Sequence, residues 1–350
     1  MSNLPILPRA FPPAPCAPGI RERAEDFRVF ELALHEPSGE GQHVWLEVEK
    51  VGCNTEWVAR TLASFAGVQS RDVGFAGMKD RNAVTTQWFS VDLKGAPEPD
   101  WEQLNVEGVT IKVHQRHRSK LRRGALEGNR FEVTLRALGT SRQGWLATRL
   151  ELIGARGVPN YFGPQRFGHD GSNLAAARML FADKPVRSRH KRGIYLSAAR
   201  AEIFNRVLAR RVALGSWAIV VPGDALIASG NARAFLHHRC REAQRGELEW
   251  GLTQGAIHPS GPLWGKGNPT AVGYARELER SVAETHGDLA GGLVKAGLTH
   301  ERRALRVVPA GIEVRWLEPP YEADAVVSFG LPKGSYATAV LRELSCEEAR

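Results

Sequence analysis

Segments with the pattern of β-strands lie at both ends of this chain, and helical segments lie between them. Apolar and polar residues alternate over 27–32, 44–48, 87–93 and 131–135, which is typical of strands with one buried face. The alternation returns near the end of the chain, at 312–316. This order predicts an α+β fold in which a helix-rich segment interrupts a sheet-forming domain.

Local connections can also be predicted. A turn with Gly and Pro at 37–41 separates the first two strands, so we predict that 27–32 and 44–48 pair as a hairpin. Residues that can cap a helix N-terminus, such as Ser197, precede segments with apolar residues at helical spacing. We therefore predict helices over about 56–66, 172–181, 198–212 and 337–344. Residues 214–275 are rich in Gly and Pro and have no clear period.

Composition excludes several classes of protein. Hydrophobic residues make up 43% and charged residues 24% of the 350 residues, which excludes a disordered chain, a coiled coil and a collagen-like fibre. No stretch approaches the roughly 18 apolar residues of a membrane span. The first residues lack the basic and apolar pattern of a secretory signal. We therefore expect a globular protein with no membrane partner.

Cysteine usage favours a reducing compartment. The four cysteines are scattered and form no Cys-x-x-Cys pair: Cys16, Cys53, Cys240 and Cys346. The nearest approach to a metal-binding cluster is His-His-Arg-Cys at 237–240, which has no second pair of ligands. We predict a cytoplasmic protein that binds no metal.

Two basic stretches indicate a nucleic-acid partner. The formal net charge is +9, and residues 108–126 and 184–201 contain no Asp or Glu. Lys and Arg in such stretches neutralise phosphates and release counterions, although a solvated basic loop has the same composition. The candidate RNA contacts are Arg116, Arg118, Lys120 and Arg122 in the first stretch and Arg189 and Lys191 in the second.

The segment 74–87 is the strongest candidate for chemistry. Its two glycines, Gly74 and Gly77, allow a tight turn, and Asp80 follows between two cations just before a strand. Nearby positive charge keeps a carboxylate ionised, so Asp80 could act as nucleophile or general base. The alternative is an aspartate in a surface turn that forms an ion pair.

Two further segments carry candidate binding residues. In 124–131, Asn129 could contact the edge of a base and Phe131 could stack on it, or the two could be a turn asparagine and a core phenylalanine. In 157–168, aromatic, polar and glycine residues alternate around Arg166, which fits a substrate-facing loop or a rigid linker.

Together these segments resemble one family, the tRNA pseudouridine synthase D (TruD) family. The resemblance runs in family order from about residue 21 to 344, and its matching segments are 25–27, 74–87, 128–131, 157–173, 197–200 and 331–338. The most specific signatures are Gly77-x-Lys79-Asp80 and the run from Asn160 to Gly168.

The resemblance implies an isomerase that converts uridine to pseudouridine without a cofactor, with position 13 in the D arm of tRNA as the usual target. Asp80 falls on the catalytic aspartate and Phe131 on the aromatic residue that stacks on the uracil. Phe27, Asn129 and Phe329 correspond to family residues that line the pocket of the target nucleotide. Lys79 is also expected to bind substrate. A family lysine that pairs with the aspartate is replaced by Arg21, with Arg23 as a second candidate.

The resemblance also implies the domains. A catalytic domain with a mixed, largely antiparallel sheet comprises 1–153 and 307–350, and an inserted α/β domain comprises 154–306. The expected partner is tRNA, with no obligate protein partner and a monomeric state.

Several alternatives remain open at this point. Asp80 could attack C1′ of the sugar, attack C6 of the base or remove the C2′ proton. A catalytically silent RNA-binding or RNA-folding protein on the same scaffold would have the same charge. A nucleosidase would use the same carboxylate and release free uracil.

Overall fold

The computed structural model describes residues 6–230, 233–236, 245–317 and 324–346. Its contacts divide the chain into two compact units. The sheet unit comprises residues 18–147 and 310–334, and the helix unit comprises 1–17, 148–309 and 335–350. Of the helices in the described ranges, none is both long and apolar enough to cross a membrane.

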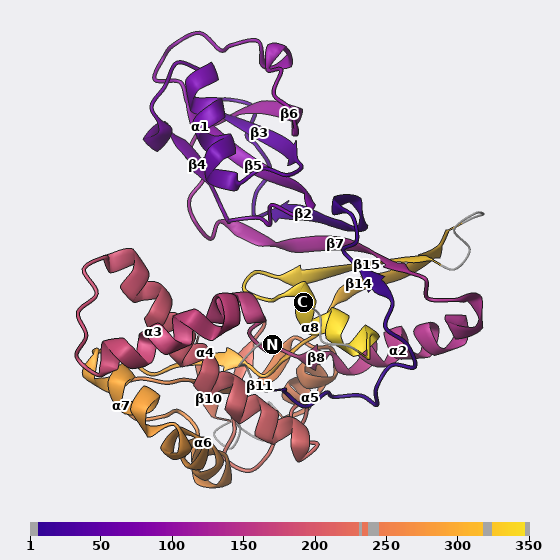
Figure 1. The fold of residues 1–350 in the computed structure, drawn as a ribbon, viewed down its shortest axis with the longest axis vertical. Helices are drawn as coiled ribbons and strands as arrows, with labels where there is room; N and C mark the ends of the chain where they lie inside the picture. The colour runs from indigo at the N-terminus through magenta and orange to yellow at the C-terminus, as the bar shows by residue number, and fades with distance from the viewer. Residues whose placement is uncertain (1–5, 231–232, 237–244, 318–323, 347–350) are drawn as a thin grey trace. The chain divides into compact units, whose positions relative to one another are not determined.

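The sheet unit is built mainly from strands (Figure 1). Its elements are β1 (Gly19–Ile20), β2 (Phe27–Ala33), β3 (His43–Lys50), α1 (Thr55–Phe65), β4 (Val73–Phe75), β5 (Val84–Asp92), β6 (Val109–His117), β7 (Leu126–Arg136), β14 (Ala310–Trp316) and β15 (Ala325–Pro332).

These strands form one mixed sheet in the order β14-β15-β7-β2-β5-β3-β6, with β1 added beside β7 and β4 beside β5. Only β2 and β5 run parallel to each other, and the other pairs are antiparallel. The predicted α+β class with a largely antiparallel sheet is therefore confirmed.

The predicted hairpin is wrong, because β5 lies between β2 and β3. The turn at 37–41 does not close two adjacent strands. Instead Gly39 N donates to Arg116 O over 2.9 Å, so this loop packs on β6. The Gly and Pro residues at 37–41 therefore predict a turn correctly, but they do not predict which strand lies beside β2.

The core of the sheet unit lies between α1 and the sheet. Alternate residues of β3 (Val44, Leu46, Val48) pack with Val58 and Leu62 of α1 and with Phe89 of β5. Full burial of each such side chain contributes about 1.5–3 kcal/mol. This layer holds α1, and the N-terminus of α1 in turn contacts the loop that carries Asp80, as described below.

The helix unit combines helices with two small antiparallel sheets. Its elements are β8 (Val158–Pro159), α3 (Ser172–Phe181), α4 (Arg189–Ala213), β9 (Ala225–Ala228), β10 (Ala234–Leu236), α5 (Arg245–Thr253), β11 (Ile257–Leu263), α6 (Gly273–Thr285), α7 (Gly287–Lys295), β12 (Glu301–Ala304), β13 (Arg306–Val307) and α8 (Ala337–Leu341). The division at residue 147 falls within α2 (Gln143–Arg156), so its first residues are counted with the sheet unit and the others with the helix unit.

Helix α4 begins nine residues before the predicted start at 198. Ser188 caps it, because its side chain accepts a hydrogen bond from Lys191 N, so the predicted cap Ser197 lies inside the helix. Residues 189–201 of the second basic stretch therefore form the first turns of α4, and residues 184–188 precede the helix as an irregular segment. Helices α3, α4 and α7 lie close together (Figure 1), and their apolar residues form a common core.

Residues 6–17 and 335–346 pack within the helix unit, although the predicted boundaries join them to the sheet domain. Arg149 Nη2 donates to Pro12 O over 2.8 Å, and Cys346 N donates to Cys16 O over 2.9 Å. These contacts join irregular segments that are far apart in the sequence, so the alternation of apolar and polar residues in the strands could not predict them.

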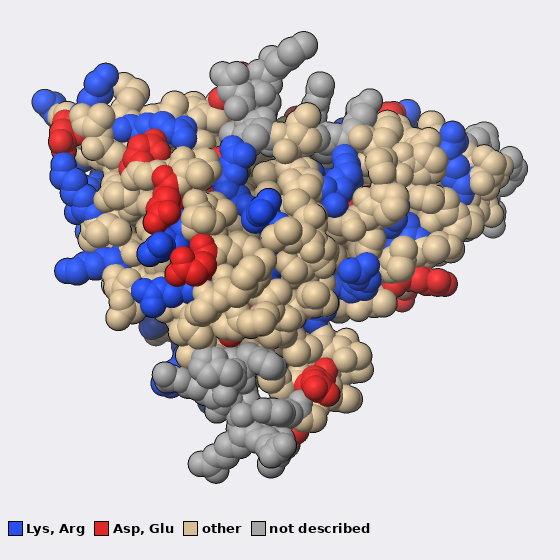
Figure 2. Space-filling view, turned by 90° about the horizontal axis from the view of Figure 1, so that it is seen from below, with Lys and Arg blue, Asp and Glu red and all other residues tan. Residues whose placement is uncertain are grey.

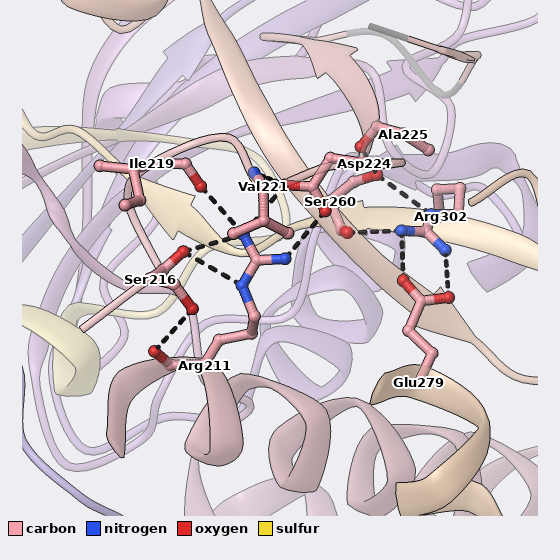
Figure 3. Close-up of polar contacts among 9 residues, drawn as sticks. All are labelled: Arg211, Ser216, Ile219, Val221, Asp224, Ala225, Ser260, Glu279 and Arg302. Atoms are coloured by element: carbon pink, nitrogen blue, oxygen red, sulfur yellow. Dashed lines mark hydrogen bonds and ion pairs between the residues drawn. The ribbon is translucent and has the colours of Figure 1, made fainter. Parts of the chain in front are cut away.

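Two buried ion pairs lie in the helix unit (Figure 3). Arg211 of α4 pairs with Asp224 over 2.8 Å, and Arg302 of β12 pairs with Glu279 of α6 over 2.7 Å. Ser260 of β11 accepts from Arg302 Nε over 3.0 Å. These pairs tie two helices and two strands together across a stretch that has little sequence periodicity.

Candidate active site

Three neighbouring strands present aromatic residues on one face of the sheet. Phe131 of β7 lies opposite Phe329 of β15 and opposite Val29 of β2, two residues after Phe27. Paired residues and alternate residues share a face. The ring centroids of Phe131 and Phe329 are 5.5 Å apart and those of Phe131 and Phe27 are 6.0 Å apart. The register therefore assembles an aromatic cluster from three segments that are far apart in the sequence.

Asn129 lies two residues before Phe131 on the same face of β7, opposite Glu31 of β2. Its Oδ1 is buried and has no hydrogen-bond partner among the described residues. A buried amide oxygen without a partner is costly, and a ligand donor would satisfy it.

Asp80 lies on the loop between β4 and β5, and the end of α1 fixes that loop. Thr55 Oγ1 accepts from Lys79 N and donates to Gln87 Oε1, each over 3.0 Å. Gln87 Nε2 donates to Gly77 O over 3.2 Å. The side chain of Asp80 is 27% exposed, and its Oδ1 accepts from Asn82 N over 3.0 Å. The carboxylate is thus held in one turn while remaining open to a ligand.

Of the two candidate cations, it is Arg21 that the structure places against Asp80. Arg21 Nη1 lies 3.3 Å from Asp80 Oδ2, and the guanidinium lies over the Phe27 ring at 3.8 Å. Arg23 is exposed. Burial lowers the pKa of Arg21, and the charge of Asp80 opposes that shift. Arg21 also has φ +63°, a strained conformation for a residue other than glycine. The ion pair and the aromatic cluster therefore meet at Arg21.

Lys79, which is predicted to bind substrate, pairs with a carboxylate other than Asp80. Its ammonium pairs with Glu31 over 2.6 Å, and its side chain is only 6% exposed. Glu31 Oε1 also accepts from Trp88 N over 3.3 Å. Lys79 therefore links the loop that carries Asp80 to β2, and its contact with substrate stays a prediction.

Lys50 is a residue near Asp80 that the sequence prediction missed. It is the last residue of β3 and has 0% exposure. Its Nζ donates to Cys53 O over 2.8 Å and to Asp80 O over 3.1 Å. Burial lowers its pKa to about 8. The sequence pattern could have predicted that Lys50 is buried, because Lys50 follows Val44, Leu46 and Val48 at the same spacing of two residues.

The four candidates of the first basic stretch differ in their partners. Arg116 pairs with Glu98 over 2.7 Å, Arg118 pairs with Glu40, and Lys120 donates to Arg71 O. Arg122 is exposed, and no ion pair of it occurs in the described part of the chain. The charge of Arg122 is therefore the most available for a phosphate.

In the helix unit, Arg189 and Lys191 are exposed in the first turn of α4, whereas Arg166 is held by two hydroxyl groups. Arg166 Nη1 donates to Ser197 Oγ over 3.1 Å, and Nη2 donates to Tyr336 Oη over 2.7 Å. Arg166 thus links segments within its own unit. On the face shown in Figure 2, Lys and Arg are spread widely with Asp and Glu among them, so net charge alone does not locate an RNA-binding surface.

Metal ligands do not gather in the described ranges: no group of three or more His, Cys, Asp or Glu residues could hold an ion there. The His-His-Arg-Cys run at 237–240 lies outside the described residues.

Comparison with known proteins identifies the family. The model of the family "tRNA pseudouridine synthase D (TruD)" matches residues 14–183 and 186–344. The chain belongs to the TruD family. It is 48% identical to the tRNA pseudouridine synthase D of Methylococcus capsulatus, over 97% of this chain and 94% of the relative. It is 47% identical to that of Nitrosococcus oceani, over 93% and 89%.

A solved structure has the same fold. The crystal structure of a Methanosarcina mazei chain described as a TruD protein matches with a TM-score of 0.76 at 23% identity, over 98% of this chain and 97% of that chain. At this identity the likeness supports the α+β fold and not the chemistry of the site. The chemistry depends on the residues around Asp80.

Proposed function

We propose that the protein is a tRNA pseudouridine synthase that isomerises uridine 13 in the D arm, with Asp80 as the catalytic carboxylate. The observation that carries the proposal is the Asp80–Arg21 pair beside three aromatic residues and the unsatisfied Asn129. Family membership and the names of the relatives support the reaction and tRNA as substrate. In this proposal the sheet unit carries the catalysis, and the protein acts as a cytoplasmic monomer.

The reaction explains why these groups are needed. The N1–C1′ bond must break, the uracil must turn, and C5 must bond to C1′, so the uridine must leave the base stack. Phe131, fixed between Phe27 and Phe329, gives the base a preorganised aromatic contact. The amide of Asn129 meets the polar edge of the base.

Asp80 has three chemically balanced routes. Attack at C1′ displaces the uracil anion. Attack at C6 gives a covalent adduct of the base, in which the N1–C1′ bond then breaks. Removal of the C2′ proton eliminates the uracil anion from C1′ and gives a glycal. Each route returns the carboxylate at the end. The product is an isomer of the substrate, so no redox partner or group donor is required, and we propose that the enzyme uses no cofactor.

The test is a turnover assay with unmodified bulk tRNA and no added metal or cofactor. Pseudouridine is mapped by carbodiimide labelling and primer extension. The proposal predicts one new stop at position 13 of the D arm. Free uracil without pseudouridine would instead indicate a nucleosidase, and salt-sensitive binding without chemistry would indicate an RNA-binding protein.

Phe131→Leu is expected to lower kcat/KM by the stacking energy of one base, about 1–3 kcal/mol. This corresponds to a decrease of about 5- to 150-fold. Phe131→Tyr keeps an aromatic ring and is expected to retain most activity. Steady-state kinetics of both variants checks the prediction. Equal kinetics for wild type and the Leu variant would show that Phe131 only packs the core.

Arg122→Gln is expected to weaken tRNA binding and to lower the slope of log K against log salt by about 1. The reason is that its charge has no acidic partner in the described residues. Arg280→Gln is the control, because Arg280 already lies 3.5 Å from Glu277 and 3.3 Å from Glu284. Binding measured at several salt concentrations checks this. An unchanged slope for Arg122→Gln would place this arginine away from the RNA.

A further inference from the structure

The side chain of Lys50 lies on the face of the sheet that carries the aromatic cluster. Lys50 is paired with Thr85 of β5, and Thr85 is paired in turn with Val29 of β2. Val29 lies opposite Phe131 of β7. Because paired residues point to the same face, the Lys50 side chain extends toward the side of the sheet where Asp80 lies.

The ammonium group of Lys50 joins two pieces of main chain. It donates to Cys53 O in the turn after β3 and to Asp80 O in the loop before β5. The second bond acts directly on the residue that carries the carboxylate. Arg21 contacts the Asp80 side chain from β1–β2, so Asp80 is held at its main chain by one cation and at its carboxylate by another.

A charged group in this position is costly for folding. Lys50 is fully buried, and it forms no ion pair among the residues that the structure describes. An apolar side chain of similar length would fill the space without the desolvation penalty. A buried charge that contacts the reacting residue and is paired only with carbonyl groups therefore indicates a role in function.

We propose that Lys50 is a positioning residue, whose buried ammonium fixes the main chain of Asp80 so that the carboxylate faces Arg21 and the bound uridine. The proposal rests on the proposed function, because it requires Asp80 to be the reacting carboxylate. The ammonium also places positive charge beside Asp80, which a neutral amine does not provide.

The titratable groups around Lys50 determine when this charge is lost. Burial lowers the pKa of Lys50 to about 8, whereas Cys53 and Asp80 raise it and Lys79 lowers it. Lys50 is therefore charged below pH 8 and becomes neutral as the pH rises through that value. Activity that depends on the ammonium must fall over the same interval.

The test measures kcat and KM for tRNA between pH 6 and 9 for the wild type, Lys50→Met and Lys50→Gln. The wild type is expected to lose kcat above about pH 8 with KM unchanged. The Met variant is expected to show a kcat about 10- to 100-fold lower at pH 7, the cost of a misplaced reacting group, with no further fall at alkaline pH. Lys94→Met is the matched control, because Lys94 is exposed and pairs with Asp72 over 2.7 Å.

Each outcome decides something. A Met variant with wild-type kcat, or with the alkaline fall intact, would overturn the proposal. If neither variant folds, the wild-type profile still decides, because a kcat that stays flat to pH 9 would overturn the role of the charge. Wild-type protein that forms no pseudouridine at any pH would overturn the proposed function and this inference with it, so the two failures are distinguishable.

Discussion

Asp80→Asn is expected to lower pseudouridine formation by at least about 10⁴-fold, the effect of removing a nucleophile or general base from an active site. An amide has no negative charge, so it cannot attack C1′ or C6 or take the C2′ proton. All three routes therefore predict the same loss. Single-turnover assays with excess enzyme measure the loss without a contribution from product release.

The fold and the RNA affinity of this variant are expected to stay close to those of the wild type. Asn has the shape of Asp, and its Oδ1 can still accept from Asn82 N, as the carboxylate does over 3.0 Å. Binding to tRNA depends mainly on charges that neutralise phosphates, and the site contributes only one carboxylate. Normal binding with lost turnover assigns Asp80 to chemistry, whereas retained turnover would remove Asp80 from the mechanism.

Arg21 makes two contacts at the site, one with the Asp80 carboxylate and one with the Phe27 ring. The guanidinium lies against both the carboxylate and the Phe27 ring, so it can orient Asp80 and also pack against the aromatic cluster. Arg21 is half-buried and has a positive φ, so its backbone adopts a strained conformation at the residue that makes both contacts. The exposed Arg23, two residues later, has no such contact with Asp80 and could not replace it without a change of backbone.

The strands of the site could be predicted because each carries its own alternation. Phe131 and Val133 share one face of β7, and the same period places Phe27 and Val29 together on β2. The order of the strands could not be predicted, since alternation describes one strand and not its neighbour. The insertion of β5 between β2 and β3 depends on contacts between distant residues, for example Val29 with Thr85.

Residues 214–275 gave no pattern because their regular elements are short or atypical. Strands β9 and β10 have only four and three residues, and β11 contains Pro259 and Pro262. Such segments contain too few alternating residues to be distinguished from a chance pattern in a loop. They are held in place instead by buried polar contacts such as that between Ser260 Oγ and Ala225 O at 2.6 Å, which no local period reveals.

The buried ion pair between Arg302 and Glu279 gives the second large effect. Arg302→Met is expected to lower the free energy of unfolding by about 3–5 kcal/mol, because it leaves the carboxylate of Glu279 buried and unpaired. In the native protein, Arg302 Nη1 and Nη2 donate to the two oxygens of Glu279 over 2.8 and 2.7 Å (Figure 3). Arg280→Met on the exposed side of the same helix is the control and is expected to change stability by no more than about 0.5 kcal/mol.

The pH dependence identifies the cause of the loss. Burial raises the pKa of Glu279 even with Arg302 beside it, and removal of the arginine takes away the opposing charge. A carboxyl whose pKa is higher in the folded state loses stability as the pH rises from its unfolded pKa to its folded pKa. Arg302→Met is therefore expected to be less destabilised at pH 5 than at pH 8 in urea unfolding.

A double variant separates the unpaired charge from the lost contacts. Arg302→Met with Glu279→Leu removes both charges and fills much of the space with apolar groups, so most of the lost stability is expected to return. Incomplete recovery has a specific source, because Ser260 Oγ loses the donor Arg302 Nε. A double variant as unstable as Arg302→Met alone would show that the hydrogen bonds to Ser260, rather than the isolated carboxylate, account for the loss.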